Sequence, residues 1–419
     1  MPQNQAAVPE PTGSASGLEA IKNSILFPAS DPGRILTMVL WPLSLLMVIQ
    51  RSLILGVNGD RTNDFKPVYF AALAFLRNQP VYTEDYSTVD PHYLYPPSGT
   101  MLLSPMAYLP YEDARWIFIA VSTICLVACA LLLAHIFGFA LTSWVAPVVL
   151  FFFFSTETVA HTLIFTNVNG FMLMAMLLFI LLLLKRWDWW AGVPIGLTIA
   201  VKPTLAPLLL LPLLNRQWRS VVTGVGVPLI LLAMSWPLSN DPSSYFTRTS
   251  KYVGETRDYY NSSISGLGTY LGVQSWLIWL LRIAAVVLAI FCLWFLYREY
   301  RTTDELLWLA TSSGVLMLTT FLVSSLGQGY YSMMLFPMVM TIFRKGSVIR
   351  NWPAWVGLYG CLSFDYWLSV RWQAMGRALE YSRVTLGWSL VLIVAFCVLL
   401  FRYLDLRKEG QAPKVFELV

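Results

Sequence analysis

Apolar runs of about 20 residues, the length a helix needs to cross the hydrocarbon core of a bilayer, recur along this chain. The 419 residues are 57% hydrophobic, with a mean hydropathy of +0.61. A water-soluble chain of this length could not bury that much apolar surface. The sequence therefore predicts an all-α polytopic membrane protein with about 10–12 transmembrane segments. The clearest predicted spans are 35–57, 113–137, 141–158, 168–184, 218–238, 275–297, 305–326, 331–343, 353–370 and 384–403.

Short basic loops set the orientation of these spans. Positive charge concentrates in cytoplasmic loops, so we expect the cytoplasmic side to hold the basic segments 185–188, 215–219, 297–301, 343–350 and 402–408. We expect a disordered cytoplasmic tail over 1–33, a single membrane domain over 34–405 and a cytoplasmic C-terminal tail over 406–419.

The segment between two of these loops is too short for two full spans. Residues 189–214 must leave the cytoplasmic side and return to it, but at 1.5 Å per residue they cannot cross a bilayer twice. Proline disfavours helical geometry in the residue before it. We therefore expect two half-helices broken before Pro203, with Lys202 at the outward tip. Lys202 could snorkel to the interface or could contact a phosphate as a fixed cation.

The first outward loop carries two carboxylates, Asp60 and Asp64. Apolar residues recur at helical spacing over 64–77, which predicts an amphipathic helix on the outer surface with Asp64 at its beginning. There Asp64 could cap the helix, or the helix N-terminus could keep it ionised as a general base.

Other polar groups gather on the same predicted outer face, and each has an ordinary structural explanation as well as a functional one. Tyrosines can anchor at the interface, asparagines can cap helices, basic loops can contact headgroups, and glycines can form tight turns. The alternative is that these side chains bind sugar hydroxyls or a lipid phosphate. They are Tyr95, Asn167, Asn169, Arg248, Lys251, Arg257, Asn261, Gln328 and Tyr330.

Motifs for cofactors and metals are missing from the sequence. There is no Gly-rich nucleotide loop, HExxH motif or CxxC pair, the five cysteines fall in apolar segments, and the three histidines are scattered. We expect no disulfide, no metal site, no cofactor and no nucleic-acid partner.

Taken in order, the outer motifs resemble one family, the polyprenyl-phosphate-sugar-dependent glycosyltransferases of family 87, which have the GT-C architecture. The matching strings are "NDFKPVY", "YLYPP", "TNVNG", "KPTLAP" and "NSSISGL". Many members have a histidine-containing element where this chain reads "GQGYYSMML" with Gln328, so no histidine can act there. Over residues 35–405 the chain is similar to the mycobacterial arabinofuranosyltransferases of this family.

The resemblance implies a GT-C fold in the plasma membrane, with the active site facing outward. The implied donor is decaprenyl-phosphoryl-β-D-arabinofuranose, and the acceptor is the 3-hydroxyl of α-(1→5)-linked arabinan. The product would be the α-(1→3) branches of arabinogalactan and lipoarabinomannan.

A β-linked donor that gives an α-linked product requires inversion, for which a single base suffices. We assign the base to Asp64, with Asp60 second. Lys202, helped by Arg248, Lys251 or Arg257, would stabilise the leaving phosphate. The expected sugar contacts are Asp60, Tyr95, Asn167, Asn169, Asn261, Gln328 and Tyr330.

Other functions remain open at this stage. The chain could be a mannosyltransferase of the same family that uses another polyprenyl-phosphate sugar, a secondary transporter, or a flippase or polymerase for lipid-linked glycans. Transporters typically carry internal repeats and polar groups near the midplane of the membrane, whereas the polar motifs here crowd one face.

Overall fold

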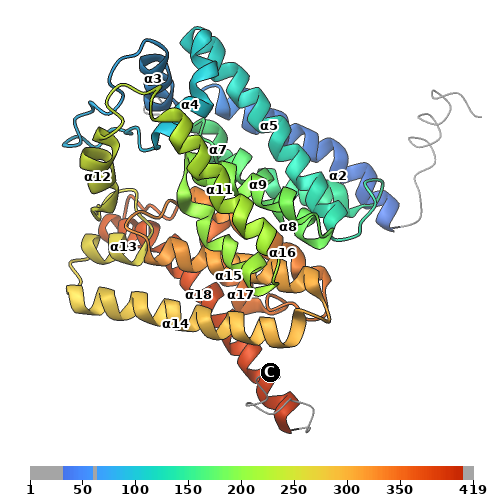
Figure 1. The fold of residues 1–419 in the computed structure, drawn as a ribbon. Coiled ribbons are helices and arrows are strands. Elements are labelled where there is room, and N and C mark those ends of the chain that lie inside the picture. The colour runs from blue at the N-terminus through green and yellow to red at the C-terminus, as the bar shows by residue number, and fades with distance from the viewer. Residues whose placement is uncertain (1–31, 60–63, 409–419) are drawn as a thin grey trace, which may run out of the picture.

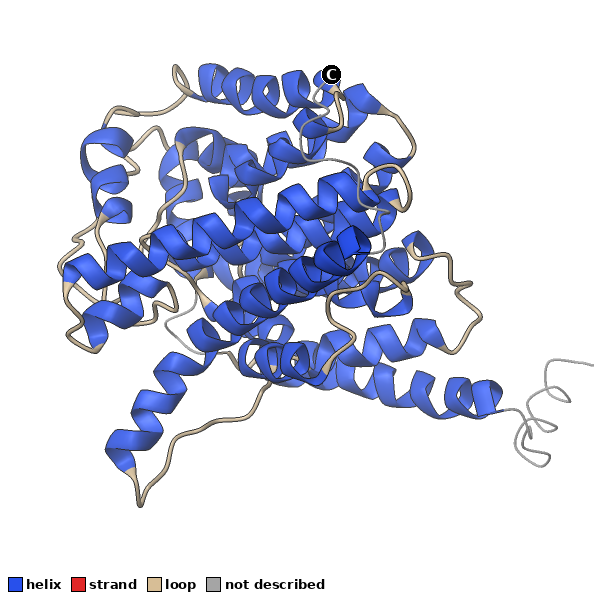
Figure 2. Cartoon of the chain, turned by 90° about the horizontal axis from the view of Figure 1, so that it is seen from below, coloured by secondary structure: helices blue, strands red, loops and turns tan. Residues whose placement is uncertain are grey.

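The computed structural model describes residues 32–59 and 64–408, and its regular elements are helices throughout that part of the chain (Figures 1 and 2). Six helices are long and apolar enough to cross a membrane: α2 (Pro32–Ile49) with its continuation η1 (Gln50–Gly56), α5 (Tyr111–Ile136), α11 (Trp218–Ser235), α14 (Ser275–Tyr300), α15 (Glu305–Val323) and α18 (Gln373–Lys408). The pair α6 (Val145–Ser155) and α7 (Glu157–Ile164) is bent by 61° and makes a possible seventh span.

Shorter apolar helices account for most of the remaining expected spans. They are α3 (Phe65–Leu76), α8 (Asn169–Leu184), η3 (Pro203–Leu209) with α10 (Leu210–Leu214), and the run η5 (Gly329–Leu335), α16 (Phe336–Met340) and η6 (Thr341–Phe343). The other elements are α4 (Pro97–Leu103), η2 (Ser104–Tyr108), α9 (Asp188–Val201), η4 (Tyr245–Thr249), α12 (Ser250–Gly254), α13 (Ile264–Tyr270) and α17 (Trp352–Leu362).

The all-α polytopic prediction is confirmed, and the chain is a multi-pass membrane protein. The number of full-length spans in the described residues is six or seven, below the 10–12 expected, because hydropathy alone cannot tell a short or broken apolar helix from a complete crossing. The predicted tails lie mostly outside the described residues, although α18 runs on to Lys408.

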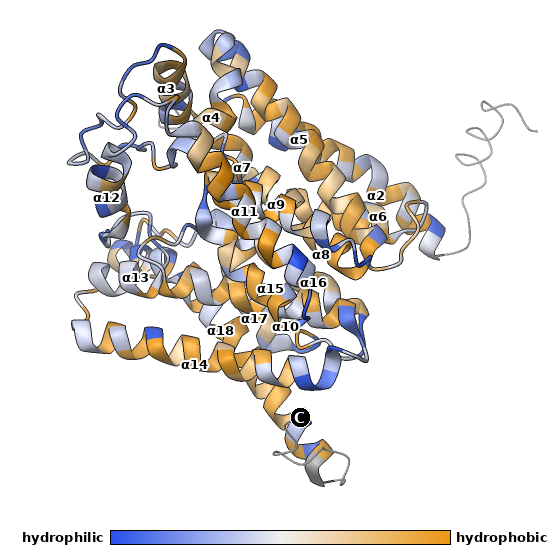
Figure 3. Ribbon diagram, in the orientation of Figure 1, coloured by the Kyte–Doolittle hydropathy of each residue, from blue (hydrophilic) through white to orange (hydrophobic). Residues whose placement is uncertain are grey.

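The centre of the molecule is α15, which is buried along nearly its whole length. In contrast, α2, α11 and α14 leave large apolar side chains exposed, including Leu46, Ile230 and Ile283. These are the orange outer helices of Figure 3. Exposed apolar surface on this scale is suited to lipid.

Basic loops that are distant in sequence meet at one end of the bundle. Arg186 forms an ion pair with Glu305 at 3.0 Å, and Arg344 lies 3.7 Å from Asp304. Similar contacts join the remaining basic loops: Arg301 donates to the carbonyl of Leu214, and Arg402 donates to the carbonyls of Gly346 and Ser347. These contacts agree with the prediction that the basic loops share one side of the membrane.

The broken hairpin is present where the sequence places it. Helix α9 ends at Val201, Lys202 is extended with φ −150° and ψ 114°, and the 3-10 helix η3 begins at Pro203. The 14 residues of α9 rise about 20 Å, so Lys202 lies that far along α9 from the end where the basic loops meet.

Candidate active site

Asp64 is positioned by the start of α3, but its side chain does not cap that helix. Its carboxylate turns inward instead. The Tyr330 hydroxyl donates to Asp64 Oδ2 at 3.1 Å, and the Asn167 amide donates to the same oxygen at 3.4 Å. The capping interpretation is therefore wrong for this side chain. Asp60, the other carboxylate of the loop, lies outside the described residues.

Lys202 faces the same cluster from the break in the hairpin. Its Nζ lies 4.2 Å from the centroid of the Tyr331 ring and 6.0 Å from that of Tyr330, which are cation–π distances. Its charge acts electrostatically on Asp64. Among the ion pairs between described residues there is none that joins Lys202 to Asp64, so the two charges share a site without neutralising each other directly.

Burial raises the pKa of the Asp64 carboxyl above its ordinary value. The positive charge of Lys202 and the hydrogen bonds from Tyr330 and Asn167 oppose that shift without cancelling it. The sequence suggested that the helix N-terminus could keep this group ionised, but burial raises its pKa. A carboxylate with a raised pKa is the stronger proton acceptor once it is ionised.

The "YLYPP" segment forms one wall of the cluster. Burial first, and then the neighbours Asp64 and Tyr331, raise the pKa of Tyr95 well above its ordinary value, so its phenol stays protonated. The segment is also fixed to the end of α9, because the Ser98 hydroxyl donates to the carbonyl of Ala200 at 2.6 Å. At Gly99, a Cβ would lie 3.2 Å from the Cα of Val201. This packing fixes the "YLYPP" segment against the end of α9, directly before Lys202.

The two asparagines of "TNVNG" have different surroundings. Asn167 contacts Asp64 and also accepts from the backbone N–H of Asn169 at 3.2 Å. The side chain of Asn169 is 1% exposed, and neither end of its amide has a hydrogen-bond partner within the described part of the chain. Asn167 therefore belongs to the Asp64 cluster, while a sugar contact by Asn169 stays a prediction.

In the basic loop 245–270, both arginines form hydrogen bonds within the protein. Arg248 donates to the carbonyls of Tyr82 and Glu84, at 2.8 and 3.1 Å. Arg257 donates to the Tyr252 hydroxyl and lies 4.4 Å from the centroid of its ring. These contacts fix the loop, and a role for Arg248, Lys251 or Arg257 at the phosphate stays a prediction.

Asn261, which we expected to contact a sugar, has its side chain engaged within the protein. Its amide donates to the carbonyls of Arg257 and Ser325 at 2.9 and 2.8 Å, and its oxygen accepts from the backbone N–H groups of Ser263 and Gly327. The buried side chain is satisfied within the protein, so it holds the loop against the turn before η5 rather than offering a sugar contact. Gln328 caps no helix with its side chain, and its role stays a prediction.

Two site residues were missed from the sequence. Tyr331 stacks under Lys202, and only its position beside Tyr330 could have indicated it. The buried hydroxyl of Thr158 donates to the carbonyl of Tyr330 at 2.5 Å and accepts from the N–H of Met333 at 3.1 Å. No sequence signal marks that threonine.

Comparison with known proteins identifies the family of this chain. The model of glycosyltransferase family 87 matches residues 93–325. Proteins named "Alpha-(1->3)-arabinofuranosyltransferase" are similar in Mycobacterium tuberculosis H37Rv (52% identity, 91% of this chain and 89% of the relative) and in Mycolicibacterium smegmatis (50%, 91% and 90%). A protein of the same name in Corynebacterium glutamicum is 42% identical over 89% of each chain. No solved structure matches the chain significantly. With more than half of its length matched by the family model and relatives this similar, the chain belongs to glycosyltransferase family 87.

Proposed function

We propose that the enzyme transfers arabinofuranose from decaprenyl-phosphoryl-β-D-arabinofuranose to the 3-hydroxyl of α-(1→5)-linked arabinan. The product is the α-(1→3) branch of arabinogalactan and lipoarabinomannan. Relatives at 42–52% identity that carry the name of this activity support the choice of sugar and linkage. The observation that carries the chemistry is the convergence of Asp64 and Lys202 on one cluster.

Asp64 acts as the general base in a single displacement. The acceptor oxygen forms a bond to the anomeric carbon, the bond from that carbon to the phosphate oxygen breaks, and the acceptor proton passes to the Asp64 carboxylate. Hydrogen bonds from Tyr330 and Asn167 to one carboxylate oxygen fix its orientation and leave the other oxygen for the acceptor. Inversion at carbon follows from this one-step path.

Lys202 stabilises the phosphate that leaves. A polyprenyl phosphate is acidic, so as it departs it needs a positive charge more than it needs a proton donor. Lys202 lies over the ring faces of Tyr330 and Tyr331. These rings position the ammonium group without forming an ion pair with it, so its charge is available to the phosphate. Arg248, Lys251 and Arg257 are candidates for a second phosphate contact.

The enzyme would act in the plasma membrane with this site facing outward. Lys202 lies about 20 Å along α9 from the turn at Arg186, where the basic loops meet. If the basic loops are cytoplasmic, as the positive-inside rule requires, the Asp64 cluster would lie in the outer half of the membrane, where a lipid-linked donor and a cell-wall acceptor would meet.

The test is transfer by the purified full-length protein in lipid nanodiscs. The donor is a synthetic polyprenyl-phosphoryl-β-D-arabinofuranose and the acceptor is an α-(1→5)-linked arabinan oligosaccharide. We expect one α-(1→3) branch, identified by NMR, and no product with an acceptor whose 3-hydroxyl is methylated. Transfer from a mannosyl-phosphoryl donor instead, or a product with a different linkage, would show that the enzyme belongs to another branch of the family.

A further inference from the structure

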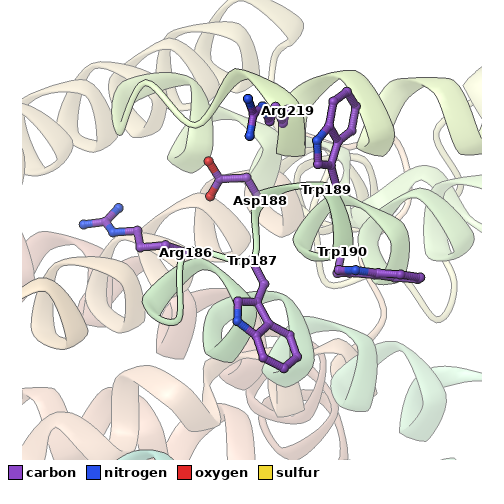
Figure 4. Close-up of a pocket in the computed structure, with 6 residues that line it drawn as sticks. All are labelled: Arg186, Trp187, Asp188, Trp189, Trp190 and Arg219. Carbon is purple, nitrogen blue, oxygen red and sulfur yellow. The ribbon is translucent and has the colours of Figure 1, made fainter.

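A cavity of about 340 Å³ lies at the end where the basic loops meet, far from Asp64. It sits between the turn that joins α8 to α9 and the beginning of α11 (Figure 4). Its lining consists of Arg186, Trp187, Asp188, Trp189, Trp190 and Arg219. None of these residues belongs to the Asp64 cluster, so the catalytic site does not account for this combination of three indoles and two guanidinium groups.

The backbone that surrounds this open pocket is fixed by contacts between α9 and α11. The Gln217 amide donates to Asp188 Oδ1 at 2.8 Å, and the Ser220 hydroxyl donates to the carbonyl of Asp188 at 2.8 Å. Helices α9 and α11 also touch backbone to backbone, because a Cβ at Gly192 would lie 2.2 Å from the carbonyl oxygen of Ser220. The beginnings of α9 and α11 are therefore fixed relative to each other.

The charges of the lining favour an anion. Arg186 and Arg219 outnumber Asp188, whose carboxylate is already engaged by Gln217. Arg219 is exposed, with its guanidinium 5.7 Å from the centroid of the Trp189 ring. Arg186 pairs with Glu305 at 3.0 Å, but its side chain is still 58% exposed.

The tryptophans indicate where the anion comes from. Trp187, Trp189 and Trp190 are 57%, 53% and 67% exposed. At the end of a membrane-spanning bundle, indole rings of this kind lie at the level of the lipid headgroups. A soluble phosphate compound has no apolar part that could pack against these indole rings. A phospholipid has acyl chains that would lie against them.

We propose that this cavity binds the phosphate of a membrane phospholipid, held by Arg186 and Arg219, with the lipid's acyl chains against the exposed indoles. The site is separate from the Asp64 cluster. The proposal does not depend on which sugar the enzyme transfers.

The experiment measures lipid binding to delipidated full-length protein by native mass spectrometry. We expect saturable binding of one dioleoylphosphatidylglycerol at this site. The double substitution R186Q/R219Q should weaken that binding about 30-fold, since each basic residue near a membrane surface contributes about 1 kcal/mol to the attraction of an anionic lipid. R186K/R219K keeps both charges and should stay within a few fold of the parent, which separates the loss of charge from a failure to fold.

Two controls make the result specific. R216Q/K345Q removes two exposed charges outside the lining and should leave the affinity nearly unchanged. E305Q breaks the ion pair of Arg186 without touching the cavity and should leave binding equal or stronger. Equal binding of dioleoylglycerol, which lacks a phosphate, would overturn the proposal. So would an equal loss in R216Q/K345Q, or binding of glycerol phosphate as tight as that of the lipid.

Discussion

Acidic and basic side chains come together at two partly buried places in the protein, and their contacts differ. Arg383 of α18 pairs directly with Glu157 of α7 and, at 3.2 Å, with Glu380. Its Nη1 group donates to the carbonyls of Gly360 and Ser363. Asp64 and Lys202, in contrast, share a site without direct contact, and aromatic rings and amides surround them.

This difference separates charges that hold the fold from charges that are available to a substrate. The buried Arg383 uses four of its five N–H groups within the protein, and these contacts join α7, α17 and α18. Asp64 and Lys202 lie in one partly buried cluster without an ion pair between them and retain unused hydrogen-bonding capacity, which is the arrangement expected at a reactive site. Five substitutions test this distinction.

The largest effect should come from Asp64→Asn. The amide keeps the size of the side chain but cannot take the proton from the hydroxyl of the arabinan acceptor. We therefore expect kcat to fall by about 10²–10⁴-fold, while the melting temperature stays close to that of the parent. The assay is arabinosyl transfer at saturating donor and acceptor. Asp90→Asn, at an exposed acid of the same outer region, is the matched control and should keep full activity. Near-parental activity in Asp64→Asn would remove the base from the mechanism.

Arg383→Gln should show the opposite pattern. It removes the arginine partner of Glu157 and Glu380, so Glu157 keeps only His161, at 3.3 Å, among the described residues, and breaking such a buried pair costs about 3–5 kcal/mol of stability. Thermal unfolding in detergent should drop sharply, while the activity of the molecules that remain folded should change far less. Arg377→Gln, at an exposed site on the same helix, should unfold like the parent. Equal stability of the two variants would mean that the buried pair does not hold the fold.

Lys202→Gln should act on the donor. Loss of the charge that faces the leaving phosphate should lower kcat/KM for the donor by about 10²–10³-fold, with a much smaller change in KM for the acceptor. Lys202→Arg should recover part of the activity. An equal effect on both substrates would assign Lys202 to general packing of the site instead.

A smaller effect is expected from Thr158→Val. The hydroxyl of Thr158 closes the turn that carries Tyr330, which in turn orients Asp64. Its loss removes one hydrogen bond from the Tyr330 carbonyl and one from the Met333 N–H, at about 1–3 kcal/mol. If Tyr330 shifts as a result, kcat should fall about 10-fold with KM little changed, and Thr158→Ser should restore it. A stability loss with parental kcat would make Thr158 purely structural.

The sequence predicted the elements that follow from local rules. Proline after Lys202 and the basic flanks of 189–214 were sufficient to predict the hairpin, and the beginning of α3 was sufficient to locate Asp64. It could not predict contacts between residues far apart in the chain. Asp64 and Tyr330 are 266 residues apart, and Thr158 and Tyr330 are 172 residues apart.

The structural role of Asn261 was hidden for the same reason. "NSSISGL" has the composition of a ligand-binding loop, and only folding brings Ser325 and Gly327 to its amide. The number of full spans was overestimated because α8 and the η5–α16–η6 run are as apolar as complete spans but shorter. A hydropathy profile reports how apolar a segment is, but it does not show where the helix in that segment begins and ends.

The smallest expected effect is a shift in the pH profile of kcat/KM, which tests how the groups around Asp64 set its pKa. The base must be ionised, so kcat/KM should fall as the pH drops through the pKa of Asp64. Because burial raises that pKa, the fall should begin at a higher pH than for an ordinary carboxylate. Tyr330→Phe removes a hydrogen bond that stabilises the ionised form, so the acid limb should move further upward, by less than about one pH unit. A downward shift would mean that Tyr330 favours the protonated acid, and the cluster would then be arranged to keep Asp64 neutral rather than ready to accept a proton.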